Sequence, residues 1–294
     1  EGGISTTIYK IGIDGISIEP AARGDVAGWL LDQFSIDEKD SYLRVATTTS
    51  WTDQTSAVYV LDGEMNVVGS LEGLSPGERI YASRFVGDML YLVTFRQIDP
   101  FFVIDLGVPS NPRVLGQLHI PGFSSYLHPV DDTHILGIGM ENSSVKVSLF
   151  DVSDPKAPVE LSRYTISNYS WSIALWDYKC ILFDGERGLL VVPVTAYDDL
   201  SYYNWWSSAY VFNVSAGDGV VLRGIIDHGN QTSISRSLYI GDYLYTVSDS
   251  MIKVNRLADL SDVGQVIYRA WSDGGRMPYL LGASGAGEAT SARM

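Results

Sequence analysis

Apolar and polar residues alternate over short stretches along most of this chain, which is the pattern of half-buried β-strands. The clearest runs are rich in β-branched and aromatic residues, which favour strands. They cover residues 42–47, 90–95, 134–139, 189–194 and 243–247. Pairs such as Gly87-Asp88 and Gly241-Asp242 precede these runs and favour tight hairpin turns. The pattern therefore predicts an all-β protein of short antiparallel strands.

One longer phrase recurs: an apolar strand that ends in Asp or Asn, then a turn and a second strand. Its six copies end at Asp14, Asp62, Asp105, Asp151, Asn213 and Asn255, with spacings of 42 to 62 residues. A repeat of about 40–50 residues made of short strands is typical of a β-propeller, in which each repeat forms one four-stranded blade. We therefore predict an all-β β-propeller of four-stranded antiparallel blades.

The repeat predicts about five and a half blades, whose strands we name A to D from the propeller axis outward. Complete sets cover residues 30–74, 79–120, 124–166, 171–228 and 234–268. Residues 5–26 supply only strands C and D, so we expect a propeller domain over 1–270 and a flexible tail over 271–294. Because open sheet edges expose unpaired backbone, we expect a closed ring of six or seven blades. An upstream segment of a longer polypeptide, or another chain, would supply the missing strands.

Several stretches of the sequence resemble a known protein family. They are residues 91–106, 121–129, 149–155 and 236–245. These stretches are similar to secreted prokaryotic proteins with a C-terminal β-propeller domain distantly related to WD40 repeats, and the similarity spans residues 5–265. The resemblance implies a secreted or cell-surface location and a longer precursor. It implies no set of catalytic residues.

Composition narrows the classes of partner. The formal net charge is −15, so phosphate backbones would be repelled and we expect no nucleic-acid partner. No apolar run approaches the roughly 18 residues of a transmembrane helix. The single cysteine, Cys180, excludes an intrachain disulfide, and we expect it to be buried. Glycosylation sequons at Asn142, Asn168, Asn213 and Asn230 favour a secreted glycoprotein.

The segment between the B and C strands of the fourth complete blade is rich in aromatic residues. It contains Tyr202, Tyr203, Trp205 and Trp206, and we attribute the 62-residue spacing to it. Tyr and Trp dominate recognition surfaces because they offer large, rigid contact area with a polar group. The alternative is that these rings pack over their own blade.

Other residues are expected on the same face, where the B–C and D–A loops emerge. Trp51 would extend the aromatic surface, with Arg96 and Arg236 as polar anchors. For Trp51 the alternative is packing on the neighbouring blade. Arg96 could instead form a salt bridge to Asp99. Arg236 could instead pair with an acidic neighbour.

Motifs for catalysis or cofactor binding are absent from the sequence. There is no nucleophile elbow, no evident Ser/His/Asp arrangement and no glycine-rich phosphate loop. We expect no cofactor. Asp198 and Asp199 are weak candidates for calcium ligands, because they lack the spacing of a dedicated loop.

These observations favour a secreted or cell-surface module that binds a protein or a glycan through its aromatic B–C/D–A face, without enzymatic activity. Two alternatives stay open. The chain could be a structural component of an extracellular assembly that docks through an open propeller edge. It could also be a polysaccharide hydrolase or lyase, which would need paired carboxylates about 5–10 Å apart.

Overall fold

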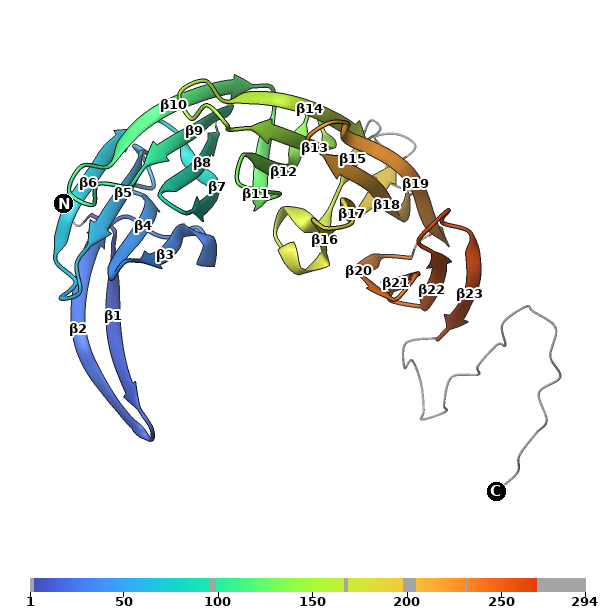
Figure 1. Cartoon of the computed structure of the whole chain (residues 1–294), viewed down its shortest axis with the longest axis horizontal. Coiled ribbons are helices and arrows are strands. Elements are labelled where there is room, and N and C mark those ends of the chain that lie inside the picture. The colour runs from blue at the N-terminus through green and yellow to red at the C-terminus, as the bar shows by residue number, and fades with distance from the viewer. Residues whose placement is uncertain (1–2, 96–98, 167–168, 198–204, 231, 269–294) are drawn as a thin grey trace. The chain divides into compact units, whose positions relative to one another are not determined.

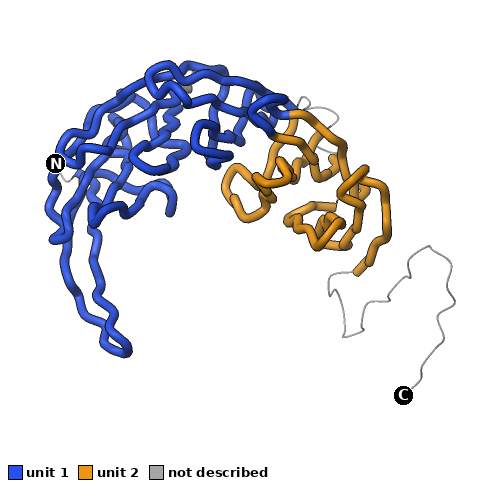
Figure 2. Tube along the Cα trace, in the orientation of Figure 1, with its two compact units in different colours: residues 1–166, 215–220 blue, residues 167–214, 221–294 orange. Residues whose placement is uncertain are grey.

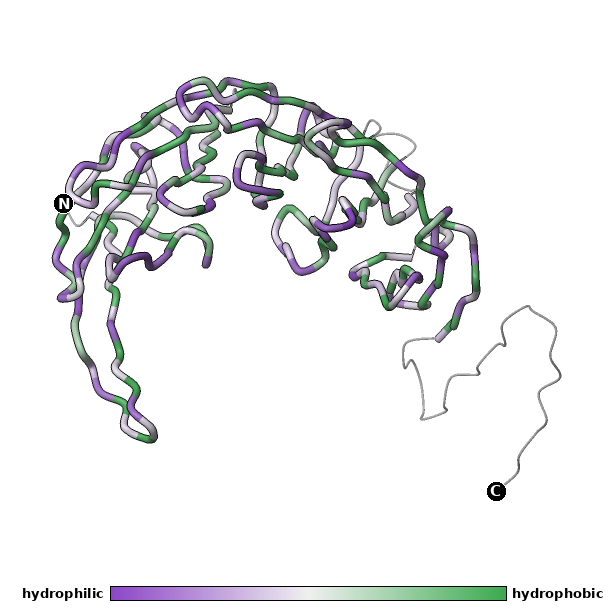
Figure 3. Tube along the Cα trace, viewed as in Figure 1, coloured by the Kyte–Doolittle hydropathy of each residue, from purple (hydrophilic) through white to green (hydrophobic). Residues whose placement is uncertain are grey.

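Strands account for nearly all of the ordered secondary structure (Figure 1). The computed structural model describes residues 3–95, 99–166, 169–197, 205–230 and 232–268. Within these ranges the chain forms strands β1 to β23 and three 3-10 helices. None of the helices in these ranges is long and apolar enough to cross a membrane. Hydrophobic stretches follow the strands, and hydrophilic residues gather at many of the turns (Figure 3).

The strands form one two-stranded sheet and five larger antiparallel sheets. The two-stranded sheet pairs β1 (Ser5–Asp14) with β2 (Ser17–Ala27). The next sheet contains β3 (Ile36–Lys39), β4 (Tyr42–Thr48), β5 (Ser56–Leu61) and β6 (Val67–Leu74). It is followed by β7 (Arg79–Val86), β8 (Met89–Phe95), β9 (Asp99–Asp105) and β10 (Arg113–Ile120).

Three further sheets complete the fold. The first contains β11 (Phe123–Pro129), β12 (His134–Glu141), β13 (Ser144–Asp151) and β14 (Val159–Ile166). The second contains β15 (Ser170–Trp171), β16 (Leu182–Asp184), β17 (Leu189–Tyr197), β18 (Trp205–Ser215) and β19 (Gly219–Asn230). The third contains β20 (Ile234–Ile240), β21 (Tyr243–Ser248), β22 (Met251–Arg256) and β23 (Asp262–Ile267). These sheets confirm the predicted all-β architecture of four-stranded antiparallel blades.

The chain divides into two compact units (Figure 2). The first covers residues 1–166 and 215–220, and the second covers 167–214 and 221–294. Within the first unit, apolar clusters fill the space between successive sheets, as where Phe101 stacks on Phe150 at 4.6 Å. Within the second unit, Val211 and Leu244 belong to the cluster that joins the β15–β19 and β20–β23 sheets.

The innermost strand of the β15–β19 sheet is split in two. β15 and β16 both pair with β17, and residues 172–181 between them form the 3-10 helices η2 (Ile173–Leu175) and η3 (Tyr178–Cys180). Pro193 of β17 lies opposite the break, where it has no N–H to donate to an inner strand. Ser172 Oγ instead donates to the Pro193 carbonyl. We had attributed the long repeat to the B–C loop, but this insertion in the inner strand also adds length.

The recurring Asp is a turn residue. Asp105 Oδ1 accepts the Gly107 N–H at 2.9 Å, and Asp151 Oδ1 accepts the Ser153 N–H at 2.8 Å. Such Asx turns start the C–D hairpins. The next residue, Leu106, is buried and donates its N–H to the Asp88 carbonyl at 2.8 Å, which ties the C–D turn to the A–B turn.

The same tie recurs in the β20–β23 sheet, where the Leu257 N–H donates to the Asp242 carbonyl at 2.8 Å. Leu257 therefore corresponds to Leu106, and Arg256 corresponds to Asp105. Asn255, which the sequence pattern had aligned with the recurring Asp, lies one position earlier.

In the first unit, two pairs of successive sheets meet at a glycine on the outermost strand. A Cβ atom at Gly69 of β6 would overlap the Pro109 carbonyl, which belongs to the C–D turn of the next sheet. A Cβ atom at Gly116 of β10 would likewise overlap the Pro155 carbonyl and lie 2.9 Å from Pro158 Cδ. Glycine lets the two backbones approach each other closely at these positions.

Gly116→Ala should lower the free energy of unfolding by about 1–3 kcal/mol, because the added methyl group overlaps the neighbouring turn. Gly264→Ala is the matched control: Gly264 also lies on an outermost strand, but its added Cβ would meet no atom within 4 Å. We expect that change to stay within about 0.5 kcal/mol. Urea unfolding of the three proteins measures both effects, and equal losses in the two variants would contradict the packing argument.

Candidate functional site

A pair of stacked tryptophans lies at the B–C/D–A end of the β3–β6 sheet. Trp29 is fixed by two backbone hydrogen bonds with Thr48, at 2.9 and 3.0 Å. Trp51, from the loop between β4 and β5, stacks on Trp29 with ring centroids 4.1 Å apart and planes inclined by 16°. Trp51 is nevertheless 68% exposed. One face of its indole is thus supported while much of the ring meets solvent.

A cavity of about 510 Å³ lies beside this pair and is formed by two loops. The B–C loop contributes Trp51 and the polar run Thr52–Thr55, and the D–A loop between β6 and β7 contributes Pro76 and Gly77. The Gly77 N–H donates to the Gln54 carbonyl at 2.6 Å, which holds the two loops together. We call Trp29, Trp51, residues 52–55, Pro76 and Gly77 the Trp51 site.

The chemistry of the Trp51 site is that of recognition. Its flat apolar surface is surrounded by hydroxyl groups, an exposed carboxylate at Asp53 and an amide at Gln54. An apolar surface with a few placed polar groups is the usual make-up of a ligand pocket. The sequence pattern pointed to Trp51 but not to Trp29, because the two residues are 22 positions apart and only the fold stacks them.

A second aromatic group lies in the second unit. Trp171 Nε1 donates to Tyr197 Oη at 2.5 Å, and the Trp171 ring stacks on Trp176 at 5.5 Å. Trp176, which follows η2, is 69% exposed. It belongs to the inserted segment of the inner strand, which the strand pattern did not reveal.

The predicted aromatic loop is only partly within the described residues. Trp205 and Trp206 begin β18 and pair with Tyr197 and Ala196 of β17. They are half-buried strand residues, so the prediction that they lie in a loop was wrong. Tyr202 and Tyr203 lie outside the described residues, as do Arg96 and the proposed calcium ligands Asp198 and Asp199.

Arg236 pairs with an acidic neighbour. Its Nη2 donates to Asp177 Oδ2 at 2.7 Å, and its Nη1 donates to the Ser235 carbonyl at 2.6 Å. Asp177 also accepts the Lys179 N–H and so caps η3. Arg236 therefore ties the inserted segment to β20, which is the structural alternative that the sequence left open.

Two sequon asparagines have described side chains. Asn142 is exposed at the turn between β12 and β13, with φ of 47°, and Asn213 is exposed near the end of β18. Asn168 and the side chain of Asn230 lie outside the described part of the chain. Both described sequons are thus sterically open at the asparagine.

Over the described ranges, no three His, Cys, Asp or Glu residues gather in a way that could hold a metal ion. Cys180 is free and buried, as predicted, and burial raises the pKa of its thiol to about 12. That thiol is therefore protonated and weakly nucleophilic at neutral pH.

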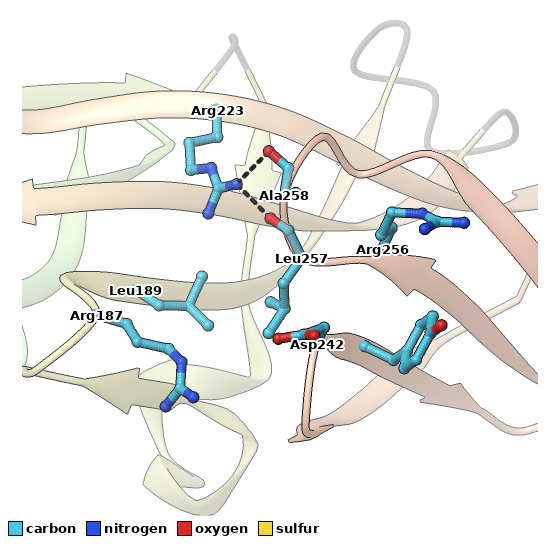
Figure 4. Close-up of a pocket in the computed structure, with 8 residues that line it drawn as sticks. Arg187, Leu189, Arg223, Asp242, Arg256, Leu257 and Ala258 are labelled. Atoms are coloured by element: carbon cyan, nitrogen blue, oxygen red, sulfur yellow. Dashed lines mark hydrogen bonds between the residues drawn. The ribbon is translucent and has the colours of Figure 1, made fainter.

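Three arginines line a cavity of about 520 Å³ between the β15–β19 and β20–β23 sheets (Figure 4). Arg223 Nη2 donates to the Leu257 carbonyl and, at 3.2 Å, to the Ala258 carbonyl. Arg187 Nη1 donates to Asp184 Oδ2 at 2.9 Å and to Tyr239 Oη at 3.2 Å. Arg223 thus ties β19 to the turn between β22 and β23, and Arg187 ties the turn between β16 and β17 to β20, so we assign this cavity a structural role.

Comparison with known families settles the fold. A family model described as "Beta propeller domain" matches residues 3–260. The chain belongs to this family. The match, the four four-stranded sheets and the β15–β19 sheet with its split inner strand together confirm the predicted β-propeller.

The curated relatives of this β-propeller include two archaeal proteins, both described as uncharacterized. One, from Archaeoglobus fulgidus, is 41% identical over 251 residues, which is 85% of this chain and 37% of that protein. The other, from Methanocaldococcus jannaschii, is 41% identical over 254 residues, which is 85% of this chain and 38% of that protein. This β-propeller thus spans less than two fifths of the length of these relatives.

Solved structures with a similar trace include the C-terminal WD40 domain of Sif2, with a TM-score of 0.49 and 12% identity over 90% of this chain and 67% of that one. A functionally unknown protein from Desulfotomaculum acetoxidans has a TM-score of 0.45 and 13% identity, over 91% of this chain and 78% of that one.

The stability of the β-propeller should fall as the pH drops from about 6.5 to about 4. His228 is buried against Thr246 Oγ1 at 2.7 Å, and burial lowers the pKa of its imidazole from 6.5 to about 4. The unfolded chain therefore takes up the proton first as the pH falls, which favours unfolding. Between pH 7 and pH 5 we expect this residue to cost about 1–2 kcal/mol of stability.

Urea unfolding at the two pH values measures this loss. His228→Gln is the control, because glutamine can accept a hydrogen bond from Thr246 but does not titrate. An equally steep pH dependence in wild type and variant would contradict the assignment to His228.

Proposed function

We propose that this β-propeller is a non-enzymatic binding module of a secreted or cell-surface protein, and that its B–C and D–A loops recognise a protein or a glycan. The exposed, pre-oriented Trp51 above its cavity carries the proposal. A tryptophan held in place by a stacked partner loses little conformational freedom when a ligand binds, so more of the contact energy appears as affinity.

Among the two ligand classes, the polar surroundings of Trp51 favour a glycan. A sugar ring has an apolar C–H face that can lie on an indole, and hydroxyl groups at its rim that need hydrogen-bond partners. The Trp51 site supplies the exposed indole face, and Asp53, Gln54 and Thr52 supply donors and acceptors beside it. Apolar contact with a few polar groups to fix orientation is how small-molecule sites obtain specificity.

Two observations support the extracytoplasmic location. The exposed positions of Asn142 and Asn213 are compatible with glycosylation. The sequence resembles secreted prokaryotic propeller proteins over residues 5–265.

The net charge of −15 disfavours nucleic acid as the partner.

Trp51→Ala should weaken binding to an oligosaccharide by about tenfold or more, because truncating a central aromatic residue of a binding site can cost about 2 kcal/mol or more. The measurement is capture of the purified chain on an array of immobilised oligosaccharides, followed by titration against the strongest ligand. Trp176→Ala is the matched control, since Trp176 is 69% exposed and also stacks on one tryptophan.

The urea midpoint of both variants should stay close to that of wild type, because both rings are mostly in solvent. Equal binding by wild type and Trp51→Ala would overturn the role of this site. If wild type captures no oligosaccharide, the glycan preference fails, and only recognition of a protein through the same loops is left.

A further inference from the structure

The charge of the Trp51 site has one sign. Of the described residues that line its cavity, Asp53 is the one with a charged side chain. The others are Trp51, Thr52, Gln54, Thr55, Pro76 and Gly77. Asp53 is exposed, and in the part of the chain that the structure describes its carboxylate forms no ion pair. A ligand in this cavity therefore meets an uncompensated negative charge.

The turn that carries this carboxylate is fixed by hydrogen bonds at its base and at its tip. At the base, Thr49 donates to the Thr55 carbonyl through its N–H at 2.8 Å and through its Oγ1 at 3.1 Å. At the tip, Ser50 Oγ accepts the N–H groups of Thr52 and Asp53, both at 3.3 Å. The main chain of Asp53 is thus held beside the stacked indole before any ligand arrives.

The charged residues of the adjoining D–A loop do not reverse this sign. The Arg79 guanidinium lies 4.6 Å from the centroid of the Tyr81 ring and donates to Tyr81 Oη at 3.1 Å. Glu78 Oε2 accepts a hydrogen bond from Thr94 Oγ1 at 2.6 Å. Neither Arg79 nor Glu78 lines the cavity. A uronic, sulfated or phosphorylated sugar would therefore face Asp53 with no cation from the cavity wall to offset the repulsion.

A protonated amine is the ligand group that suits both Trp51 and Asp53. An ammonium group is attracted to the face of an aromatic ring, and tryptophan binds it best. The same group forms a charge-assisted hydrogen bond with a carboxylate. A neutral ligand would instead remove water from the Asp53 carboxylate without supplying a charge to replace it, which costs affinity.

We infer that the glycan bound at the Trp51 site contains amino sugars whose nitrogen is not acetylated. The C–H face of such a sugar lies on the Trp51 indole, and its ammonium group pairs with Asp53. Thr52 and Gln54 then serve the neighbouring hydroxyl groups. This inference rests on the proposed function, because it names the class of glycan that the same site selects.

Calorimetric titration with two oligosaccharides of equal length tests the inference. One is an oligomer of glucosamine and the other is the same oligomer of N-acetylglucosamine, in low-salt buffer slightly below neutral pH, where the free amines are charged. We expect the chain to bind the glucosamine oligomer about tenfold more tightly, as a hydrogen bond between two charged groups would provide. Added salt should reduce this preference, because it screens the ion pair.

Asp53→Asn should remove the preference. It should weaken binding of the glucosamine oligomer by about tenfold and leave binding of the N-acetylated oligomer unchanged. Asp249→Asn is the matched control, because Asp249 is an exposed carboxylate in the turn between β21 and β22, at the same end of another sheet. It removes the same charge and should alter neither affinity. Equal weakening by the two variants would assign the attraction to the overall charge of the protein and overturn the role of Asp53.

The titrations also separate this inference from the proposed function. Equal or tighter binding of the N-acetylated oligomer would overturn the amino-sugar inference and leave a glycan-binding module standing. Binding of neither these oligomers nor any other oligosaccharide would remove the glycan function and this inference together. Binding of a lysine-rich peptide that depends on Asp53, without binding of the glucosamine oligomer, would also overturn the inference and identify a protein as the source of the amine.

Discussion

Close contact between a C–D turn and the outermost strand of the preceding blade is the constraint on which the rest of this fold depends. At Gly69 and Gly116 the two backbones are so close that even a methyl group is excluded. The turn must therefore have one shape and one depth. The Asp at the end of strand C fixes the shape through its Asx turn, and the buried Leu106, tied to the A–B turn, fixes the depth. The Asp that recurs in the sequence marks the turn that makes this contact.

The opposite ends of the blades are free of that constraint. The blades of this chain differ from one another mainly at those ends. The B–C loop of the β3–β6 sheet carries Trp51, and the inserted segment after β15 carries Trp176. A scaffold that fixes one end of each blade and leaves the other end variable can present different side chains without altering its packing. This division explains why we look for binding at the B–C/D–A ends and assign the arginine-lined cavity, at the A–B/C–D ends, to structure.

Much of the fold could be predicted from the sequence, because alternation, turn residues and the recurring Asp are local signals. The B strands, the hairpins and the grouping into blades all follow from them. The split inner strand could not be predicted, since Pro193 signals only that β17 lacks one donor and not that its neighbour is interrupted. Asn255 was aligned with the recurring Asp in place of Arg256 for a related reason. The turn tie that defines its position is a backbone hydrogen bond, which leaves no mark on residue type.

The site was less predictable than the fold, because a site depends on which side chains a fold brings together. Composition identified Trp51 as an unusual loop residue, but its stacking on Trp29 depends on the bridge between Trp29 and Thr48. In the same way, aromatic richness identified Trp205 and Trp206, whereas strand pairing decides that they are half-buried. Exposure in the fold separates recognition from packing among aromatic residues. Of the aromatic residues predicted to bind, Trp51 is the one whose described surroundings leave a supported ring open to a ligand.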